Sequence, residues 1–144
     1  MTPVILDTSV TIAWLLPDEP LHAQAVALHD QIVAGLVTPI VASHHRFEVR
    51  HALVRAAQRS RCAWPELPGY LEDLGEMEMD EASSEVSDSL ALSLCRDLRL
   101  SWGDSQWVAL AIRRGFPLVT ADMRLARTVP ADVAWIQSLS DRPE

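Results

Sequence analysis

The chain has 144 residues and contains no lysine, so all twelve of its basic residues are arginine. This absence excludes mechanisms that need a lysine amine: Schiff-base catalysis, a Ser-Lys dyad and the lysine of a phosphate-binding loop. Glycine is also scarce, with five residues and no glycine-rich loop that could hold the phosphates of a nucleotide. The chemistry of this protein therefore has to come from other groups.

Cysteine and long apolar runs are scarce as well. The two cysteines, Cys62 and Cys95, are far apart in sequence and are expected to be reduced thiols in the core. No apolar stretch approaches the roughly 20 residues of a membrane span, and Asp7 interrupts the first apolar run, which argues against a secretory signal. We expect a cytoplasmic protein that does not enter a membrane.

The composition predicts one domain over residues 1–144, with a core of about 3–137, because 49% of the residues are apolar. The formal net charge is −8. An acidic protein does not bind nucleic acid through its overall charge. Any contact with nucleic acid must therefore depend on local arginines and on bound cations.

Apolar runs typical of buried strands alternate along the chain with helical patterns. Strands are predicted at 3–7, 37–42, 76–80, 116–120 and 133–136, before a polar tail from Ser138. Helices are predicted at 8–16, 20–34, 44–61 (with Ser43 as N-cap), 65–75, 82–98, 103–114 and from Asp122 to about 128. This alternation is typical of an α/β fold with a mostly parallel sheet covered on both faces.

Four acidic residues occupy similar places in this pattern. Asp7 and Asp122 each follow a buried strand, and the carboxyl ends of parallel strands form the edge where ligands bind. Asp104 and Glu48 lie in the first turns of two helices that follow connections at or near that edge. Each acid also has a simpler explanation, as a helix cap or a solvated side chain. Their similar positions, with hydroxyls beside two of them, favour a shared site; the hydroxyls are those of Thr8, Ser9 and Thr120.

A shared acidic site needs protons or cations. Two carboxylates about 5 Å apart repel by roughly 3 kcal/mol at an effective dielectric constant of ~20. Oxygen ligands favour Mg²⁺ or Mn²⁺ over zinc, and Mg²⁺ often completes its shell with water and substrate phosphate. The pattern therefore predicts phosphodiester chemistry with a metal-activated water.

Four short motifs occur in order along the chain: Asp7-Thr8-Ser9, Phe47-Glu48-Val49 followed by Ala52-Leu53, Asp104 in Asp-Ser-Gln-Trp-Val-Ala-Leu-Ala, and Thr120-Ala121-Asp122. Their order and spacing resemble the PIN domain, from Val4 to about Ile136. Within that family the chain is most similar to the VapC-type ribonuclease toxins of bacterial toxin–antitoxin pairs.

The resemblance implies a three-layer α/β/α sandwich with Mg²⁺- or Mn²⁺-dependent endoribonuclease activity on RNA, leaving 5′-phosphate and 3′-hydroxyl ends. It also implies a cognate antitoxin and, usually, a homodimer. The catalytic and metal-binding quartet would be Asp7, Glu48, Asp104 and Asp122, and the supporting residues would be Thr8, Ser9, Thr120 and His51. His51 departs from the family, whose members often carry asparagine there, and this puts in doubt the hydrogen bond that orients Glu48.

The helix predicted at 44–61 carries further candidates for residues that bind RNA or a metal. Its arginines suggest contacts with RNA, and we single out Arg46, Arg50, Arg55 and Arg59. Glu48, His51, Arg55 and Arg59 fall on one helical stripe, although a solvated face would give the same pattern. His44 and His45 are expected to be a surface pair, with metal ligation as the alternative. Trp102 and Trp107 are expected to pack in the core, with base stacking as the alternative.

Three other functions fit part of the pattern. A PIN nuclease could process RNA outside any toxin system, and a PIN-like module without catalysis could only bind a partner. A haloacid-dehalogenase-like phosphatase would use Asp7 as nucleophile. That chemistry needs a second aspartate two residues on, where Ser9 stands, as well as a lysine.

Overall fold

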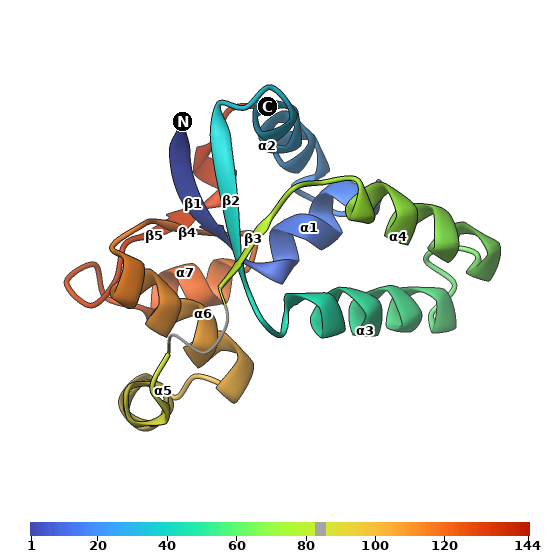
Figure 1. The fold of residues 1–144 in the computed structure, drawn as a ribbon. Coiled ribbons are helices and arrows are strands. Elements are labelled where there is room, and N and C mark those ends of the chain that lie inside the picture. Colours follow the sequence, from blue (N-terminus) through green and yellow to red (C-terminus); the bar gives the residue numbers. More distant parts are fainter. Residues whose placement is uncertain (83–85) are drawn as a thin grey trace.

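A parallel sheet organises the chain in the computed structural model, which describes residues 1–82 and 86–144. The strand order is β3-β2-β1-β4-β5, and every pairing between neighbours is parallel. The strands are β1 (Thr2–Leu6), β2 (Val37–Ala42), β3 (Asp80–Ala82), β4 (Leu118–Thr120) and β5 (Ile136–Ser138). Figure 1 shows β1 and β2 near the middle of the molecule, with helices to either side.

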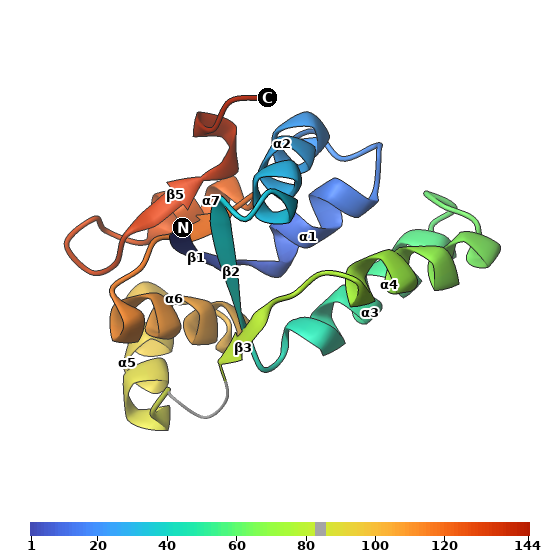
Figure 2. The ribbon, with the colours of Figure 1, turned by 45° about the horizontal axis from the view of Figure 1, so that its top comes forward.

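Helices cover both faces of this sheet. They are α1 (Thr8–Leu15), α2 (His22–Val33), α3 (His45–Gln58), α4 (Leu67–Gly75), α5 (Asp88–Leu98), α6 (Trp102–Arg114) and α7 (Met123–Thr128), with short 3₁₀ turns at Trp64–Glu66 and Leu139–Asp141. Figures 1 and 2 both show α1 to α4 on one side and α5 and α6 on the other. The architecture is the α/β/α sandwich that the sequence pattern predicts.

The core is centred on the neighbouring strands β1 and β4. Ile5, Leu6, Leu118 and Val119 are fully buried, and burying each such side chain contributes roughly 1.5–3 kcal/mol. Leu6 pairs with Val119 in register. The residues that follow these two strands therefore emerge at the same edge of the sheet, at the same level.

Helix α3 carries the chain away from the carboxyl end of β2, and Figure 1 shows α3 and α4 extending from the sheet and joined at their far end. Just beyond α3, Arg61 donates to Asp18 at 2.9 and 3.1 Å and to Glu19 at 2.8 Å. These bonds tie the end of α3 to the loop between α1 and α2.

Near residue 80, one strand and one helix begin later in the structure than the sequence pattern predicts. The edge strand predicted at 76–80 is formed by Asp80–Ala82, which pairs with Ile40–Ala42 of β2. The alternation that suggested the earlier start arises because Met77 and Met79 pack against the core without joining the sheet. The helix predicted from residue 82 begins at Asp88, with Ser87 as its N-cap. Residues 83–85 of that prediction lie outside the described residues.

The other strand and helix ends differ by a few residues. Strand β4 begins two residues later than predicted, and β5 runs over 136–138 instead of 133–136. The tail after Ser138 is not simply polar, because Leu139 is fully buried. The N-cap of α3 is His44, so the assignment of Ser43 was wrong.

Both cysteines are free thiols, as expected, but they are half-buried and not fully enclosed in the core. In the described ranges, none of the helices is long and apolar enough to cross a membrane.

Candidate functional site

A cavity of about 580 Å³ opens where β1 and β4 end. Its lining includes four carboxylates from four separate segments, those of Asp7, Glu48, Asp104 and Asp122, besides that of Glu19. The same walls include Thr8, Ser9, Ile12, Glu19, Phe47, His51, Ala52, Arg55, Ala56, Arg59, Arg61 and Ala121. The structure therefore brings together the four acids that the sequence pattern singled out.

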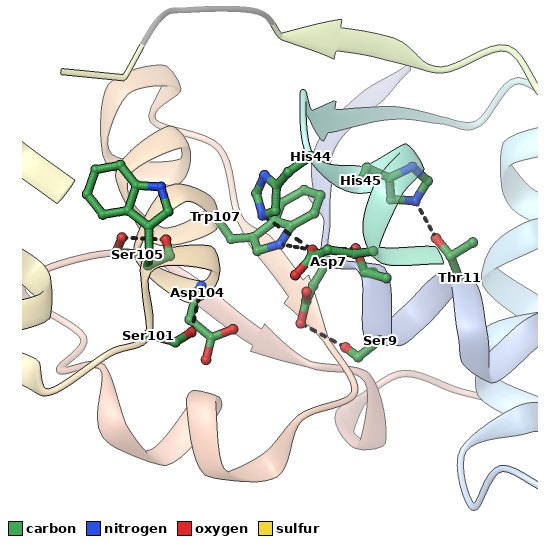
Figure 3. A network of polar contacts seen from close by, with 12 residues as sticks. Asp7, Ser9, Thr11, His44, His45, Ser101, Asp104, Ser105 and Trp107 are labelled. Carbon is green, nitrogen blue, oxygen red and sulfur yellow. Dashed lines mark hydrogen bonds and ion pairs between the residues drawn. The ribbon is translucent and has the colours of Figure 1, made fainter. Parts of the chain in front are cut away.

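Asp7 is the deepest of these acids. Its backbone N–H donates to the carbonyl of Val119 at 3.1 Å, which continues the pairing of β1 with β4. Its Oδ2 accepts from the hydroxyl of Thr120 at 2.7 Å. The same oxygen accepts from the hydroxyl of Ser9 at 2.8 Å (Figure 3). Burial raises the pKa of Asp7 to about 6, although these two hydrogen bonds act in the opposite direction.

Asp104 lies in the first turn of α6, and Asp122 is the N-cap of α7. Burial raises the pKa of Asp104, and the charges of Asp122 and Glu48 raise it further. Asp122 Oδ1 accepts from the backbone N–H groups of Arg124 and Leu125 at 3.0 and 3.2 Å, so this residue does cap α7. The helix-cap explanation therefore applies to Asp122, and it is compatible with a place in the acidic cavity.

Glu48 is held by donors from two other helices. Its Oε1 accepts from Thr8 Oγ1 at 2.8 Å and from the indole Nε1 of Trp107 at 3.0 Å. His44 Nε2 lies 3.3 Å from the same oxygen. One carboxylate oxygen thus links α1, α3 and α6 at the wall of the cavity.

The sequence did not predict the hydrogen bond from Trp107 to Glu48. Trp107 is fully buried, as predicted for a core residue. A buried indole N–H needs a hydrogen-bond acceptor. Trp107 follows Asp104 by about one helical turn, so the sequence could have indicated that this acceptor is an acid of the cavity. Trp102, which was also predicted to be in the core, is 49% exposed; it is the first residue of α6, where the helix begins at the surface.

The prediction of a surface pair at His44 and His45 was wrong. His45 is buried, and its Nε2 lies within hydrogen-bond distance of Thr11 Oγ1 at 2.9 Å (Figure 3). Burial lowers the pKa of His45 to about 4, which keeps the ring neutral at pH 7. The ring of His44 packs against Trp107, with 5.0 Å between ring centroids.

His51 stacks on Phe47. The two ring centroids are 5.9 Å apart and the rings are inclined by 17°. Both residues line the cavity. Thr8 and Trp107 supply hydrogen bonds to Glu48 in this chain, so the orientation of Glu48 does not depend on an amide at position 51.

The candidate arginines divide into two groups. Arg55 and Arg59 line the cavity, on the same stripe of α3 as Glu48 and His51. Arg46 and Arg50 are not part of its walls, and Arg50 Nη1 donates to the carbonyl of Arg46 at 3.0 Å. Only the first pair is in a position to contact a ligand of this cavity.

Most of the potential metal ligands of the cavity are carboxylate and hydroxyl oxygens. Such ligands suit Mg²⁺ or Mn²⁺, and the raised pKa of Asp7 indicates a buried anion that a cation would stabilise. Over residues 1–82 and 86–144, no group of three or more His, Cys, Asp or Glu side chains forms a ready-made metal site. Mg²⁺ is commonly bound through one or two carboxylates and several waters, so the acids of this cavity are compatible with such an ion.

We expect Asp7→Asn to stabilise the metal-free protein. A pKa of about 6 instead of 3.8 means that folding favours protonated Asp7, so stability falls as the pH rises between these values and stays low above them. At pH 7.5 the substitution should raise the free energy of unfolding by up to about 3 kcal/mol.

Urea unfolding in EDTA at pH 7.5 and pH 4 measures this effect, and the gain should disappear at the lower pH. Asp132→Asn, at an exposed residue outside the cavity, is the control. An Asp7→Asn protein no more stable than the wild type at pH 7.5 would contradict the assignment of a buried, unfavourable charge.

Comparison with known proteins agrees with this geometry. The model of the PIN domain family matches residues 4–129. The structure of PAE2754 from Pyrobaculum aerophilum superposes with a TM-score of 0.70 at 17% identity, covering 96% of this chain and 85% of that one. The structure of VapBC2 from Rickettsia felis, bound to a DNA fragment from their promoter, gives a TM-score of 0.65 at 14% identity, covering 95% and 98%.

A comparison with curated protein sequences gives no match. At these identities the two structures show a common fold, and the family model covers most of the chain. PIN domains are generally nucleases. The chain belongs to the PIN domain family.

Proposed function

We propose that this protein is a Mg²⁺- or Mn²⁺-dependent endoribonuclease that acts as the toxin of a toxin–antitoxin pair. The observation that carries the proposal is the meeting of four carboxylates from four segments in one cavity, beside Arg55 and Arg59. A set of acids alone repels a phosphodiester, whereas acids with a divalent cation attract one. When bound, the ion would act as a Lewis acid and activate water for in-line attack on phosphorus.

The residues of the chain have distinct tasks in this proposal. Asp7 is the principal candidate to hold the ion, because Thr120 and Ser9 fix its Oδ2. Glu48, fixed by Thr8 and Trp107, would hold the ion through water or hold a second ion. Asp104 and Asp122 would complete the oxygen ligands of the site.

Arg55 and Arg59 are the proposed contacts for the RNA backbone. Among the described residues neither forms an ion pair, whereas Arg61, on the same wall, is bonded to Asp18 and Glu19. The two guanidiniums lie on the same helical stripe as Glu48 and lead away from it. A strand whose scissile phosphate lies at the acids could therefore place neighbouring phosphates along α3.

The proposed partners are a cognate antitoxin and a second copy of the chain, and the proposed location is the cytoplasm. The likeness to a structure described as VapBC2 supports an antitoxin. A PIN nuclease that processes RNA outside a toxin system would have the same site. A small reading frame directly upstream of the gene favours the toxin.

We expect Asp7→Asn and Asp104→Asn each to lower RNA cleavage at least about 100-fold, because each removes a charge that would bind the ion. Cleavage of end-labelled RNA with Mg²⁺, Mn²⁺ or EDTA measures this, with Asp132→Asn as the control outside the cavity. Full activity in either variant, or in EDTA, would refute the mechanism. An absence of Mg²⁺ and Mn²⁺ binding in calorimetry would favour an inactive PIN-like module.

Neutralising Arg55 and Arg59 together should weaken RNA binding and its dependence on salt. For two phosphate contacts to a single strand, the slope of log K against log [NaCl] should become less steep by about 1.4. Fluorescence anisotropy of a labelled oligonucleotide measures the slope for Arg55→Gln/Arg59→Gln. The matched control is Arg46→Gln/Arg50→Gln, which removes the same charge from the same helix; equal changes in both double variants would contradict the assignment.

Trp107→Phe tests the orientation of Glu48. It removes the indole N–H and keeps an aromatic ring, so Mn²⁺ affinity or kcat should fall about 10- to 100-fold, the usual effect of losing a partner of a metal ligand. Trp14→Phe makes the same change at a second buried tryptophan on α1. Thermal unfolding shows whether both variants lose similar stability, and a Trp107→Phe protein with wild-type Mn²⁺ affinity and kcat would show that the bond is only structural.

A further inference from the structure

The aromatic pair Phe47 and His51 lies at the surface of the acidic cavity. Phe47 is 72% exposed, although it is a large apolar side chain, and it lines the cavity directly beside Glu48. His51 is exposed as well, and the two rings are nearly parallel, inclined by 17° with 5.9 Å between centroids. This flat aromatic surface is not needed for the core.

The pair belongs to the stripe of α3 that faces the cavity. Positions 47 and 51 are one turn apart, and Arg55 and Arg59 continue the stripe at further turns. From Phe47 to Arg59 the helix rises about 18 Å. A ligand lying along this stripe would meet carboxylates, then flat rings, then two cations, all on the wall of one cavity.

An RNA strand with exposed bases has the matching chemistry. Its phosphates suit the two guanidiniums, and every base has an apolar face that can stack on an aromatic ring. In a duplex the bases are stacked on one another and cannot reach such a surface, whereas unpaired bases can be splayed onto it.

A second copy of the chain or another protein fits this surface less well. Protein interfaces bury about 800 Å² on each partner, and two rings surrounded by charged side chains form only a small apolar patch. Glu48 and Arg55 are the charged residues of α3 that line the cavity within one helical turn of the pair.

We propose that Phe47 and His51 form a stacking platform for an unpaired base next to the cleaved phosphodiester. The proposal rests on the ribonuclease function proposed above. It assigns a base-binding role to Phe47 and His51, two cavity residues that the ribonuclease proposal does not use.

The experiment uses single-stranded RNA oligonucleotides with 2-aminopurine at successive positions, bound by the full chain carrying Asp104→Asn to prevent cleavage. At one position next to the scissile bond, binding should quench the fluorescence because the base stacks. Phe47→Leu keeps an apolar side chain but removes the ring, and should abolish this quenching and weaken binding about 5- to 150-fold. Phe47→Trp should retain both.

Trp135→Leu is the matched control, since Trp135 is 58% exposed and lies outside this cavity. In the cleavage-competent protein, Phe47→Leu should raise KM for single-stranded RNA with little change in kcat, and a duplex of the same sequence should be cut poorly by the wild type.

Unchanged quenching and affinity in Phe47→Leu, or equal cleavage of duplex and single strand, would overturn the platform while leaving the nuclease intact. A Phe47→Leu protein that changes its oligomeric state in gel filtration but binds RNA normally would also overturn it, in favour of a contact between copies. A wild-type protein that cleaves no RNA would instead refute the proposed function itself.

Discussion

The structure depends on the placement of one carboxylate at the end of a buried strand. Asp7 follows β1, and its position is fixed because β1 pairs with β4 through fully buried side chains. The burial that fixes it also opposes its charge and raises its pKa to about 6. Two hydroxyls, from Ser9 and Thr120, compensate only in part. The fold therefore keeps an unfavourable anion at the base of its cavity, as expected where function opposes stability.

Glu48 is placed by a different means, because it lies on α3 and does not directly follow a strand. Its carboxylate is reached by Thr8 from α1 and by Trp107 from α6, so that helices from both sides of the sheet meet at one oxygen. This arrangement couples the wall of the cavity to the packing of the core. A change in the way α6 packs would move the indole and, with it, the carboxylate that the indole holds.

The sequence allowed good prediction of features that depend on local patterns. The continuous apolar run of β1 and the strand before Asp122 placed two acids at one edge, and the helical period placed Arg55 and Arg59 on the stripe of Glu48. The errors concern residues whose structure is determined by tertiary packing and not by the local sequence pattern. Met77 and Met79 alternate like a strand but pack beside the sheet. His45 has a polar side chain that is buried against Thr11, and the partner of the Trp107 indole lies 59 positions away in the chain.

His51 follows Glu48 by nearly one turn of α3, and its ring stacks on Phe47. In relatives with asparagine at that position, the amide is expected to orient the glutamate. Here Thr8 and Trp107 provide hydrogen bonds to Glu48 from the core side, so position 51 is released from that task. Its ring is available to stack on Phe47 at the surface of the cavity. In a chain with a net charge of −8, attraction to RNA cannot come from overall charge; contacts with bases would add binding that neither depends on charge nor requires further arginines near the acids.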